Sequence, residues 1–173
     1  MWRWAVAVAL VGGTATVQAA DPLEILVTGT IEKNCALATA DADVDLGRVD
    51  RAGWVSFALE VSCNTPFTYE IRSANGALVQ ASGLRPIGGF EVRVPYRVRF
   101  TLPLEDGDLG GLDVVCGSEE LGAAFRRCGA GDSGTSIAIR GRATVTLSWP
   151  DARSPLLAGV YTDRLIVTFG VKP

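Results

Sequence analysis

An alternating apolar pattern at both ends of the chain most constrains its fold, because a terminal strand must find a partner for its edge. Near the N-terminus, one face of the pattern is formed by Leu23, Ile25, Val27, Gly29 and Ile31. At the other end, the inward positions are Tyr161, Asp163, Leu165, Val167, Phe169 and Val171, and the sequence stops at Pro173. A strand buries one face and pairs through its backbone edges. We therefore expect a β-domain that either closes on itself or exchanges strands with a neighbour.

Residues 1–20 are predicted to be a secretory signal peptide. Arg3 supplies a positive charge, residues 4–11 are apolar, and either 17–19 (Val-Gln-Ala) or 18–20 (Gln-Ala-Ala) offers a small-residue cleavage site. The apolar run is too short to span a bilayer, which disfavours the alternative of an uncleaved anchor. The leader contains one Arg and no acid, so 16 − 1 leaves 15 basic residues against 19 acidic ones. This mild acidity gives no support for nucleic-acid binding.

Four cysteines in an exported chain predict two disulfides. Three pairings are possible from sequence alone. We select Cys35–Cys63, because both residues lie at strand ends, and Cys116–Cys128, because they bracket one loop-like segment. A zinc site is disfavoured, since no spacing is C-x2-C and the chain contains no His.

The two-residue period predicts further strands along the chain. They cover residues 55–63 and 67–71, a stretch from 90 to 102 that Pro95 divides, and residues 137–149. Only Glu119–Arg127 suggests a helical turn. The pattern predicts a single all-β domain, a sandwich of about seven strands. The Gly- and Asp-rich segment 104–134 is expected to be a long loop, functional or mobile, that a disulfide restrains.

Several short motifs resemble catalytic or metal sites but lack essential members. Residues 131–134, Gly-Asp-Ser-Gly, resemble a serine-protease nucleophile, yet the chain has no His to act as the base, so a surface turn is favoured. Asp41, Asp43 and Asp45 imitate a calcium loop without its Gly and Glu, which favours a turn or a solvated strand face. We expect no enzyme activity, no cofactor and no metal.

A basic face is a further candidate for ligand binding. It would be formed by Arg93, Arg97, Arg99, Arg140 and Arg142. Alternating polar exteriors of strands produce such a pattern by default, so a solvated sheet face is favoured.

Five segments occur in an order that resembles a known family. They are the alternating residues 25–31 leading to Cys35, Val-Asp-Leu-Gly at 44–47, the strand 55–63 with Asn-Thr-Pro-Phe-Thr at 64–68, Pro-Tyr-Arg-Val at 95–98, and Ala-Gly-Val-Tyr-Thr-Asp at 158–163. In this order they resemble the spore coat protein U domain, the module of pilin subunits in archaic chaperone–usher pili. The resemblance covers nearly all of the chain after the leader, apart from the segment with two cysteines.

The resemblance implies an incomplete immunoglobulin-like β-sandwich that lacks its final strand and is completed by donor-strand complementation. It implies three parts: the leader 1–20, an N-terminal donor extension over 21–34, and a pilin domain over 35–173. Donor residues would be Leu23, Ile25, Val27, Gly29 and Ile31, with Gly29 at a site that admits no bulk. The partners implied are a periplasmic chaperone, an outer-membrane usher and neighbouring subunits, with passage through the periplasm to a cell-surface fimbria.

The expected function is a structural subunit, a minor pilin, that polymerises by donor-strand exchange for adhesion and biofilm formation. The alternative is an autonomous secreted binding module, such as a carbohydrate-binding sandwich with the segment 104–134 as its site. A stable monomer that needs no chaperone would favour the second hypothesis.

Overall fold

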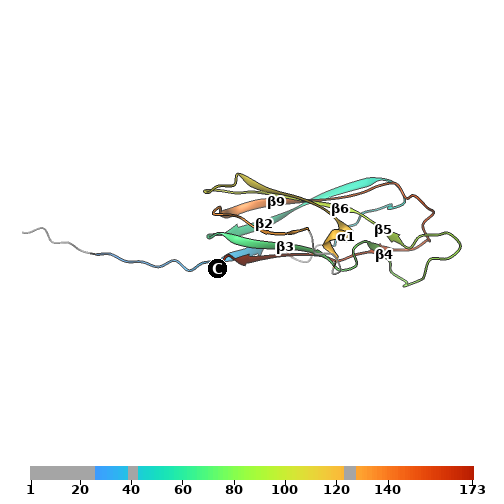
Figure 1. Cartoon of the computed structure of the whole chain (residues 1–173), viewed down its shortest axis with the longest axis horizontal. Coiled ribbons are helices and arrows are strands. Elements are labelled where there is room, and N and C mark those ends of the chain that lie inside the picture. The colour runs from blue at the N-terminus through green and yellow to red at the C-terminus, as the bar shows by residue number, and fades with distance from the viewer. Residues whose placement is uncertain (1–25, 39–42, 123–127) are drawn as a thin grey trace, which may run out of the picture. The chain divides into compact units, whose positions relative to one another are not determined.

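The computed structural model describes residues 26–38, 43–122 and 128–173, and almost all regular structure within them is β-strand (Figure 1). Residues up to Ile31 form one unit, and Glu32–Pro173 form a compact domain that contains every element. The strands are β1 (Cys35–Ala38), β2 (Gly53–Cys63), β3 (Phe67–Ser73), β4 (Leu78–Gln80), β5 (Arg93–Val94), β6 (Arg97–Pro103), β7 (Gly111–Gly117), β8 (Ala130–Asp132), β9 (Ala138–Trp149), β10 (Tyr161–Thr162) and β11 (Leu165–Val171). The one helix in the described residues is α1 (Ser118–Leu121).

The largest sheet has five antiparallel strands in the order β1-β2-β9-β6-β7. β2 and β9 form its long central pair, which runs from Gly53 opposite Trp149 to Cys63 opposite Ala138. Both strands alternate inward apolar residues with outward ones that are mostly polar, with Trp54 and Ile139 as large apolar exceptions. This alternation gives a sheet one buried face and one face in water.

Two smaller antiparallel sheets complete the domain. The sheet β11-β3-β8 forms a second layer beneath the five-stranded sheet, and the sheet β10-β4-β5 lies toward one end of the domain (Figure 1). β11 pairs with β3 along its whole length, from Leu165 opposite Ser73 to Val171 opposite Phe67. Cys35 of β1 pairs with Cys63, just before β3 begins. The start of β1 and the end of β11 therefore lie at the same end of the domain, which we call the β1 end.

Side chains from both larger sheets fill one apolar core. The ring centroid of Phe100 in β6 lies 6.1 Å from that of Phe169 in β11 and 6.4 Å from that of Tyr69 in β3. Phe100 and Val61 are completely buried. Burying one large apolar side chain contributes roughly 1.5–3 kcal/mol, so this shared core is what holds the two layers together.

The fold is all-β and antiparallel, as the alternating pattern predicts. The strands expected over 55–63, 67–71 and 137–149 are present as β2, β3 and β9, and Pro95 separates β5 from β6 as expected. The expected number of seven strands is too low, since the described residues contain eleven. Those not anticipated include β1, β4 and β8, whose three or four residues are too few to show a clear period.

One further expectation needs correction. Residues 26–34 contain no strand, although an alternating strand is predicted over 23–31. A period of two creates a strand only where a partner edge is available. Of the helical turn expected over 119–127, the described residues contain α1, Ser118–Leu121. Residues 123–127 and the predicted leader, 1–20, lie outside the described residues.

Candidate functional site

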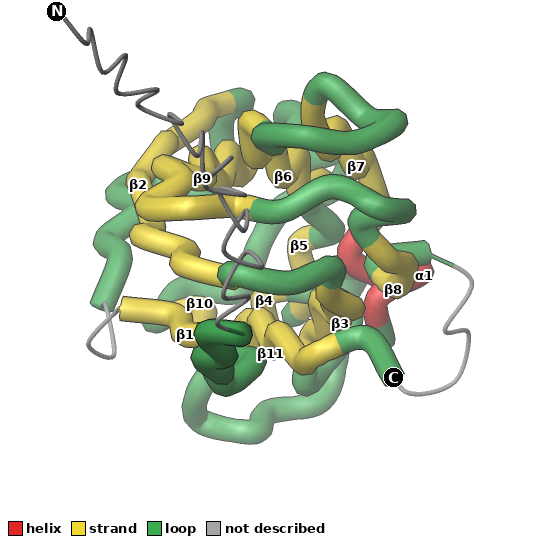
Figure 2. The backbone as a smooth tube through the Cα atoms, turned by 90° about the vertical axis from the view of Figure 1, so that its left-hand side faces the viewer, coloured by secondary structure: helices red, strands yellow, loops and turns green. Residues whose placement is uncertain are grey.

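Two sheet edges are open on the same side of the domain. One edge of β11 pairs with β3, and no strand of the described residues pairs with its other edge. β1 lies beside β11, but no ladder of backbone hydrogen bonds joins them (Figure 2). β1 covers β2 only from Glu60 to Cys63, so residues 53–59 of β2 also have an outer edge without a paired strand in the part of the chain that is described. Unpaired backbone groups at such edges are a template for another strand.

Half-buried apolar side chains follow these edges, and we call this set the apolar seam. It comprises Leu37, Leu46, Val49, Val55, Phe57, Leu165, Val167 and Phe169. Along β2, the inward side chains change from half-buried at Val55 and Phe57 to buried at Leu59 and Val61. Along β11, no inward side chain is fully buried. Apolar surface therefore remains in water on the side where both sheets have open edges.

A disulfide holds one border of the seam. It joins Cys35 of β1 to Cys63 of β2, which are directly opposite each other in the ladder. The second disulfide joins Cys116 at the end of β7 to Cys128. These are the two pairs selected from the sequence. Because β1 pairs with β2 over only four residues, the first disulfide keeps this short edge strand in place.

Asp163 determines where β11 begins, at the other border of the seam. Its Oδ2 accepts hydrogen bonds from the hydroxyls of Tyr96, at 2.7 Å, and of Ser73. Its Oδ1 accepts the backbone N–H groups of Asn75, at 3.0 Å, and Arg164, at 2.7 Å. Burial, followed by the hydrogen bond to Asp163, raises the pKa of the Tyr96 phenol above its ordinary value of 10.0. One half-buried carboxylate thus ties two other segments, residues 73–75 and Tyr96, to the start of β11.

The residues just before Asp163 build the same corner. Gly159 has φ +149°, and a Cβ there would collide with the Gln80 side chain. The Tyr161 hydroxyl donates to the carbonyl of Leu157 at 2.7 Å. The sequence at 158–163 therefore has a structural role in positioning β11, independent of any resemblance.

Of the five predicted donor residues, the structure describes Val27, Gly29 and Ile31, while Leu23 and Ile25 lie outside the described residues. The side chains of Val27 and Ile31 are 86 % and 87 % exposed. A Cβ added at Gly29 would meet no atom within 4 Å. These apolar side chains have no core of their own in the described structure, and their exposure would be relieved by a partner.

The segment 104–134 is not the long loop that the sequence suggests. β7 extends the five-stranded sheet, and β8 pairs with β3. The remaining turn at Asp108 is fastened by Thr135, whose backbone N–H and hydroxyl donate to Asp108 Oδ1 at 2.9 and 2.8 Å. These bonds hold the pKa of Asp108 below its ordinary value of 3.8. Gly and Asp at the turns conceal the short apolar strand between them, which explains the wrong prediction.

Ser133 corrects a second expectation, because it is completely buried and does not lie on the surface. Its Oγ accepts the backbone N–H of Phe67 at 3.0 Å and donates to the carbonyl of Ser136 at 2.7 Å. The hydroxyl thus satisfies backbone groups inside the domain. These bonds give Ser133 a structural role in the turn that joins β8 to β9.

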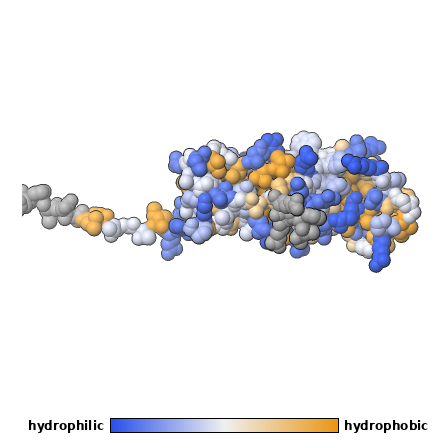
Figure 3. All heavy atoms as spheres, viewed as in Figure 1, coloured by the Kyte–Doolittle hydropathy of each residue, from blue (hydrophilic) through white to orange (hydrophobic). Residues whose placement is uncertain are grey.

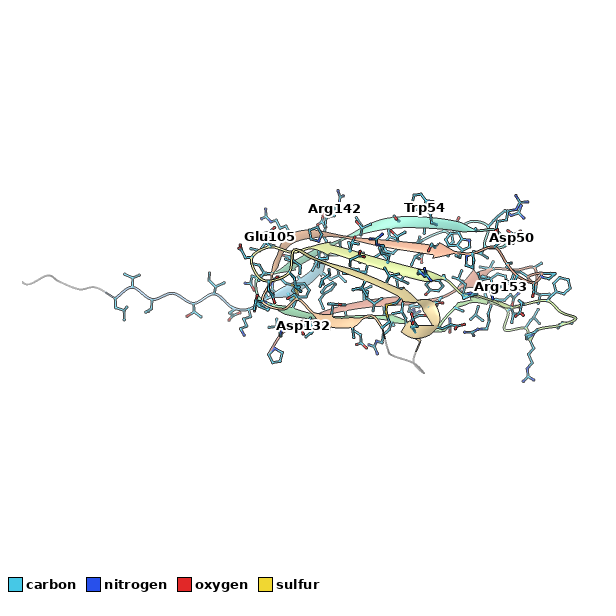
Figure 4. All side chains as sticks on the ribbon, turned by 45° about the horizontal axis from the view of Figure 1, so that its top comes forward. Asp50, Trp54, Glu105, Asp132, Arg142 and Arg153 are labelled. Atoms are coloured by element: carbon cyan, nitrogen blue, oxygen red, sulfur yellow. A yellow bond between two sulfur atoms is a disulfide. The ribbon has the colours of Figure 1, made fainter. Side chains whose placement is uncertain are left out.

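The five arginines do not share one face. Arg93 belongs to the sheet β10-β4-β5 and donates to the carbonyl of Asn75 at 2.6 Å. Arg142 projects from the outer side of the five-stranded sheet (Figure 4) and stands opposite Glu60 in the ladder. On the same sheet, Arg99 forms two hydrogen bonds with Asp113, at 2.9 and 2.7 Å. Acidic partners make this face mixed in charge rather than a basic binding surface.

Metal ligands are not gathered anywhere in residues 26–38, 43–122 and 128–173. Asp45 accepts the backbone N–H of Gly47 at 2.8 Å in a turn, and Asp41 lies outside the described residues. None of the helical residues described forms a helix long and apolar enough to cross a membrane.

The chain matches no family model, no curated protein and no solved structure. The features from which a function can be inferred are therefore the open strand edges, the apolar seam and the exposed apolar residues before Glu32.

Proposed function

We propose that this protein is a structural subunit, a minor pilin, of a chaperone–usher fimbria that serves adhesion and biofilm formation. Its domain is an immunoglobulin-like sandwich without its final strand, and a strand from another protein completes it. The observation that carries the proposal is the free edge of β11 beside the half-buried side chains of the apolar seam. During export, a periplasmic chaperone supplies the strand; at the outer-membrane usher, the N-terminal extension of a neighbouring copy replaces it.

The N-terminal extension is suited to act as a donor strand because its apolar residues recur at every second position. Residues 23–31 place apolar side chains at every second position apart from Gly29, which is what an added strand needs to fill pockets along one face. Burial of each aliphatic side chain contributes roughly 1.5–3 kcal/mol, before the cost of ordering the segment. Several such side chains together with a backbone ladder suffice for a stable non-covalent joint.

Strand direction favours a neighbour over self-insertion. Antiparallel pairing with β11 is slightly more stable than parallel pairing, and it would place Ile31 beside Leu165. Leu165 lies about 20 Å along β11 from Val171 and hence from the β1 end. Only Glu32–Asn34 separate Ile31 from Cys35, a reach of at most about 14 Å. The segment is too short to pair antiparallel with its own β11, so another copy must supply it.

A synthetic peptide of residues 21–34 tests the proposal on protein expressed with its own leader and purified after export. We expect the peptide to bind and to raise the midpoint of thermal unfolding, and a peptide with Ile25→Asp and Val27→Asp to do neither. A soluble monomer that unfolds reversibly, does not bind the peptide and keeps the same unfolding midpoint in its presence would contradict donor-strand completion. That result would favour the autonomous binding module instead.

A further inference from the structure

Four exposed apolar side chains form a patch on two loops, which we call the loop-end patch. Leu84, Ile87 and Phe90 come from the loop after β4, and Val160 precedes β10. Their exposed fractions lie between 43 and 69 %. None of the four belongs to the apolar seam. Apolar side chains exposed on neighbouring loops indicate a surface that another molecule covers.

The two loops are held together by backbone bonds. Ala81 N–H donates to the carbonyl of Val160 at 2.7 Å, and Leu157 N–H donates to the carbonyl of Glu91 at 2.9 Å. Gly88 and Gly89 have φ of +58° and +83°, values that favour glycine, and they form the turn before Phe90. The patch is therefore presented by shaped turns anchored to the sheet β10-β4-β5.

The patch lies at the end of the domain opposite the β1 end. β3 runs from Phe67 at the β1 end to Ser73, which is paired with Leu165 at the start of β11. The sheet β10-β4-β5 and its loops lie beyond this point (Figure 1). Figure 3 shows apolar atoms gathered at this end of the domain.

We propose that the loop-end patch is the docking surface for the domain of the next copy of this chain in the fibre. This inference rests on the proposed function. When a donor strand pairs antiparallel with β11, its C-terminal end emerges from the acceptor beside Leu165. This is the end of the acceptor domain opposite the β1 end, which we call the loop end. The donor copy's domain begins at the next residue after Ile31, Glu32, so it must sit against the acceptor's loop end. The donated strand and the docked domain then form one continuous interface.

The surface that would meet the patch is the β1 end of the donor copy. Two exposed apolar side chains lie there: Val171 at the end of β11, and Leu109 in the turn between β6 and β7. The same end carries Glu32–Asn34, whose backbone is fixed by Asn64: its Oδ1 accepts the N–H of Asn34 at 2.7 Å, and its Nδ2 donates to the carbonyl of Glu32 at 3.0 Å. The donor extension therefore begins from a stretch of backbone that Asn64 holds in place. This fixed connection orients the donor domain against the patch.

The test separates docking of the domain from insertion of the strand. In the protein exported with its own leader, Ile87→Ser with Phe90→Ser is compared with Val115→Ser, an equally exposed site on β7 away from both ends. We expect the double variant to bind the peptide 21–34 as the unmodified protein does, because the peptide has no domain to dock. Association between copies, measured by light scattering against concentration, should weaken about tenfold or more, while the control remains unchanged.

Leu84→Ser with Val160→Ser provides a second variant that tests both loops, with circular dichroism to verify folding. Normal assembly by both double variants would overturn the docking surface and leave strand donation intact. Failure of the unmodified protein to bind the peptide would overturn the proposed function and the docking surface together. Loss of assembly with retained peptide binding is the result that only a docking role predicts.

Discussion

The Tyr96 hydroxyl donates a 2.7 Å hydrogen bond to Oδ2 of Asp163, and this bond joins the entrance of β6 to the start of β11. The two residues are 67 positions apart in the sequence. One of them precedes a central strand of the larger sheet, and the other precedes the strand with the open edge. The position of the proposed acceptor edge is thus set by a polar contact and not only by apolar packing.

Replacing Tyr96 by Phe should lower the free energy of unfolding by about 2 kcal/mol, because a bond to a charged acceptor is lost. The matched control is Tyr161→Phe, whose hydroxyl donates to a neutral carbonyl at a similar distance. That change should cost about 1 kcal/mol. Urea unfolding followed by circular dichroism measures both values, and equal losses would show that the Asp163 carboxylate adds nothing.

Alkaline pH should reduce the difference in the free energy of unfolding between the Tyr96→Phe variant and the unmodified protein. The pKa of Tyr96 is raised in the folded state, so its contribution is fully present below the unfolded value of about 10 and is lost as pH rises above that value. The Phe variant has no such proton to lose at this position. Urea unfolding of both proteins at about pH 8 and about pH 11 measures the difference. An equal difference in the free energy of unfolding at the two pH values would contradict a raised pKa of Tyr96 in the folded state.

Long alternating strands could be predicted from the sequence, whereas the contacts that position them could not. β2 and β9 were predictable because ten or more residues keep a strict period of two. Ser133 and Asp163 were not, because a hydroxyl or carboxylate in a turn has the same local pattern whether it is solvated or buried. Their burial depends on Phe67 and Tyr96, which are distant in sequence.

The open edge could be expected only in part. An alternating final strand indicates that β11 exists, but the fact that β3 is its one partner among the described strands is a property of the sheet order. The loop-end patch was also hidden, because Leu84, Ile87 and Val160 come from segments without periodicity, and Phe90 lies in a stretch whose alternation predicts a strand instead of a loop. Loop positions become a surface only when the fold brings them together.

Titration of the Asp108 carboxyl at acidic pH should detect the hydrogen bonds that Thr135 donates to it. The pKa of Asp108 lies below 3.8, first because of the Thr135 backbone N–H and then because of its hydroxyl. A lowered pKa contributes stability above the unfolded value, and this stability is lost as pH falls through the folded value. Thr135→Val removes only the hydroxyl, so the carboxyl titration of Asp108 measured by carbon NMR should move upward and remain below 3.8. An unchanged titration would contradict the hydroxyl bond.

The two disulfides should affect peptide binding differently. Cys35→Ala with Cys63→Ala should lower the free energy of unfolding by about 3–4 kcal/mol, because a loop closed over 28 residues is released. It should also weaken binding of the peptide 21–34, since β1 borders the seam. Cys116→Ala with Cys128→Ala should cost about 3 kcal/mol and leave binding unchanged, because β7 is at the far edge of that sheet. Calorimetric titration at a temperature where both variants are folded measures the affinity. Equal weakening of binding in both would show that β1 has no special part in it.

Two complementary variants should convert the polymer into a dimer. Ile25→Asp with Val27→Asp places charges on the donor strand, so that chain can accept a strand but not donate one. Val167→Asp places a charge in the apolar seam on β11, so that chain can donate but not accept. Each variant alone should remain unassembled, because burying an unpaired carboxylate is strongly unfavourable.

Mixed in equal amounts, the two variants should form heterodimers and nothing larger, since the bound acceptor has no working donor strand and the bound donor has no working seam. Size-exclusion chromatography with light scattering measures the mass, and circular dichroism verifies that both domains are folded. Thr168→Asp is the control for the seam variant, because it adds the same charge to the outward face of β11 and should still polymerise. Polymers formed by either variant alone would contradict the assignment of donor and acceptor strands. A mixture that stays monomeric while each variant is folded would also contradict this assignment. In such a mixture, one variant has an intact seam and the other has an intact donor strand, so the two should associate.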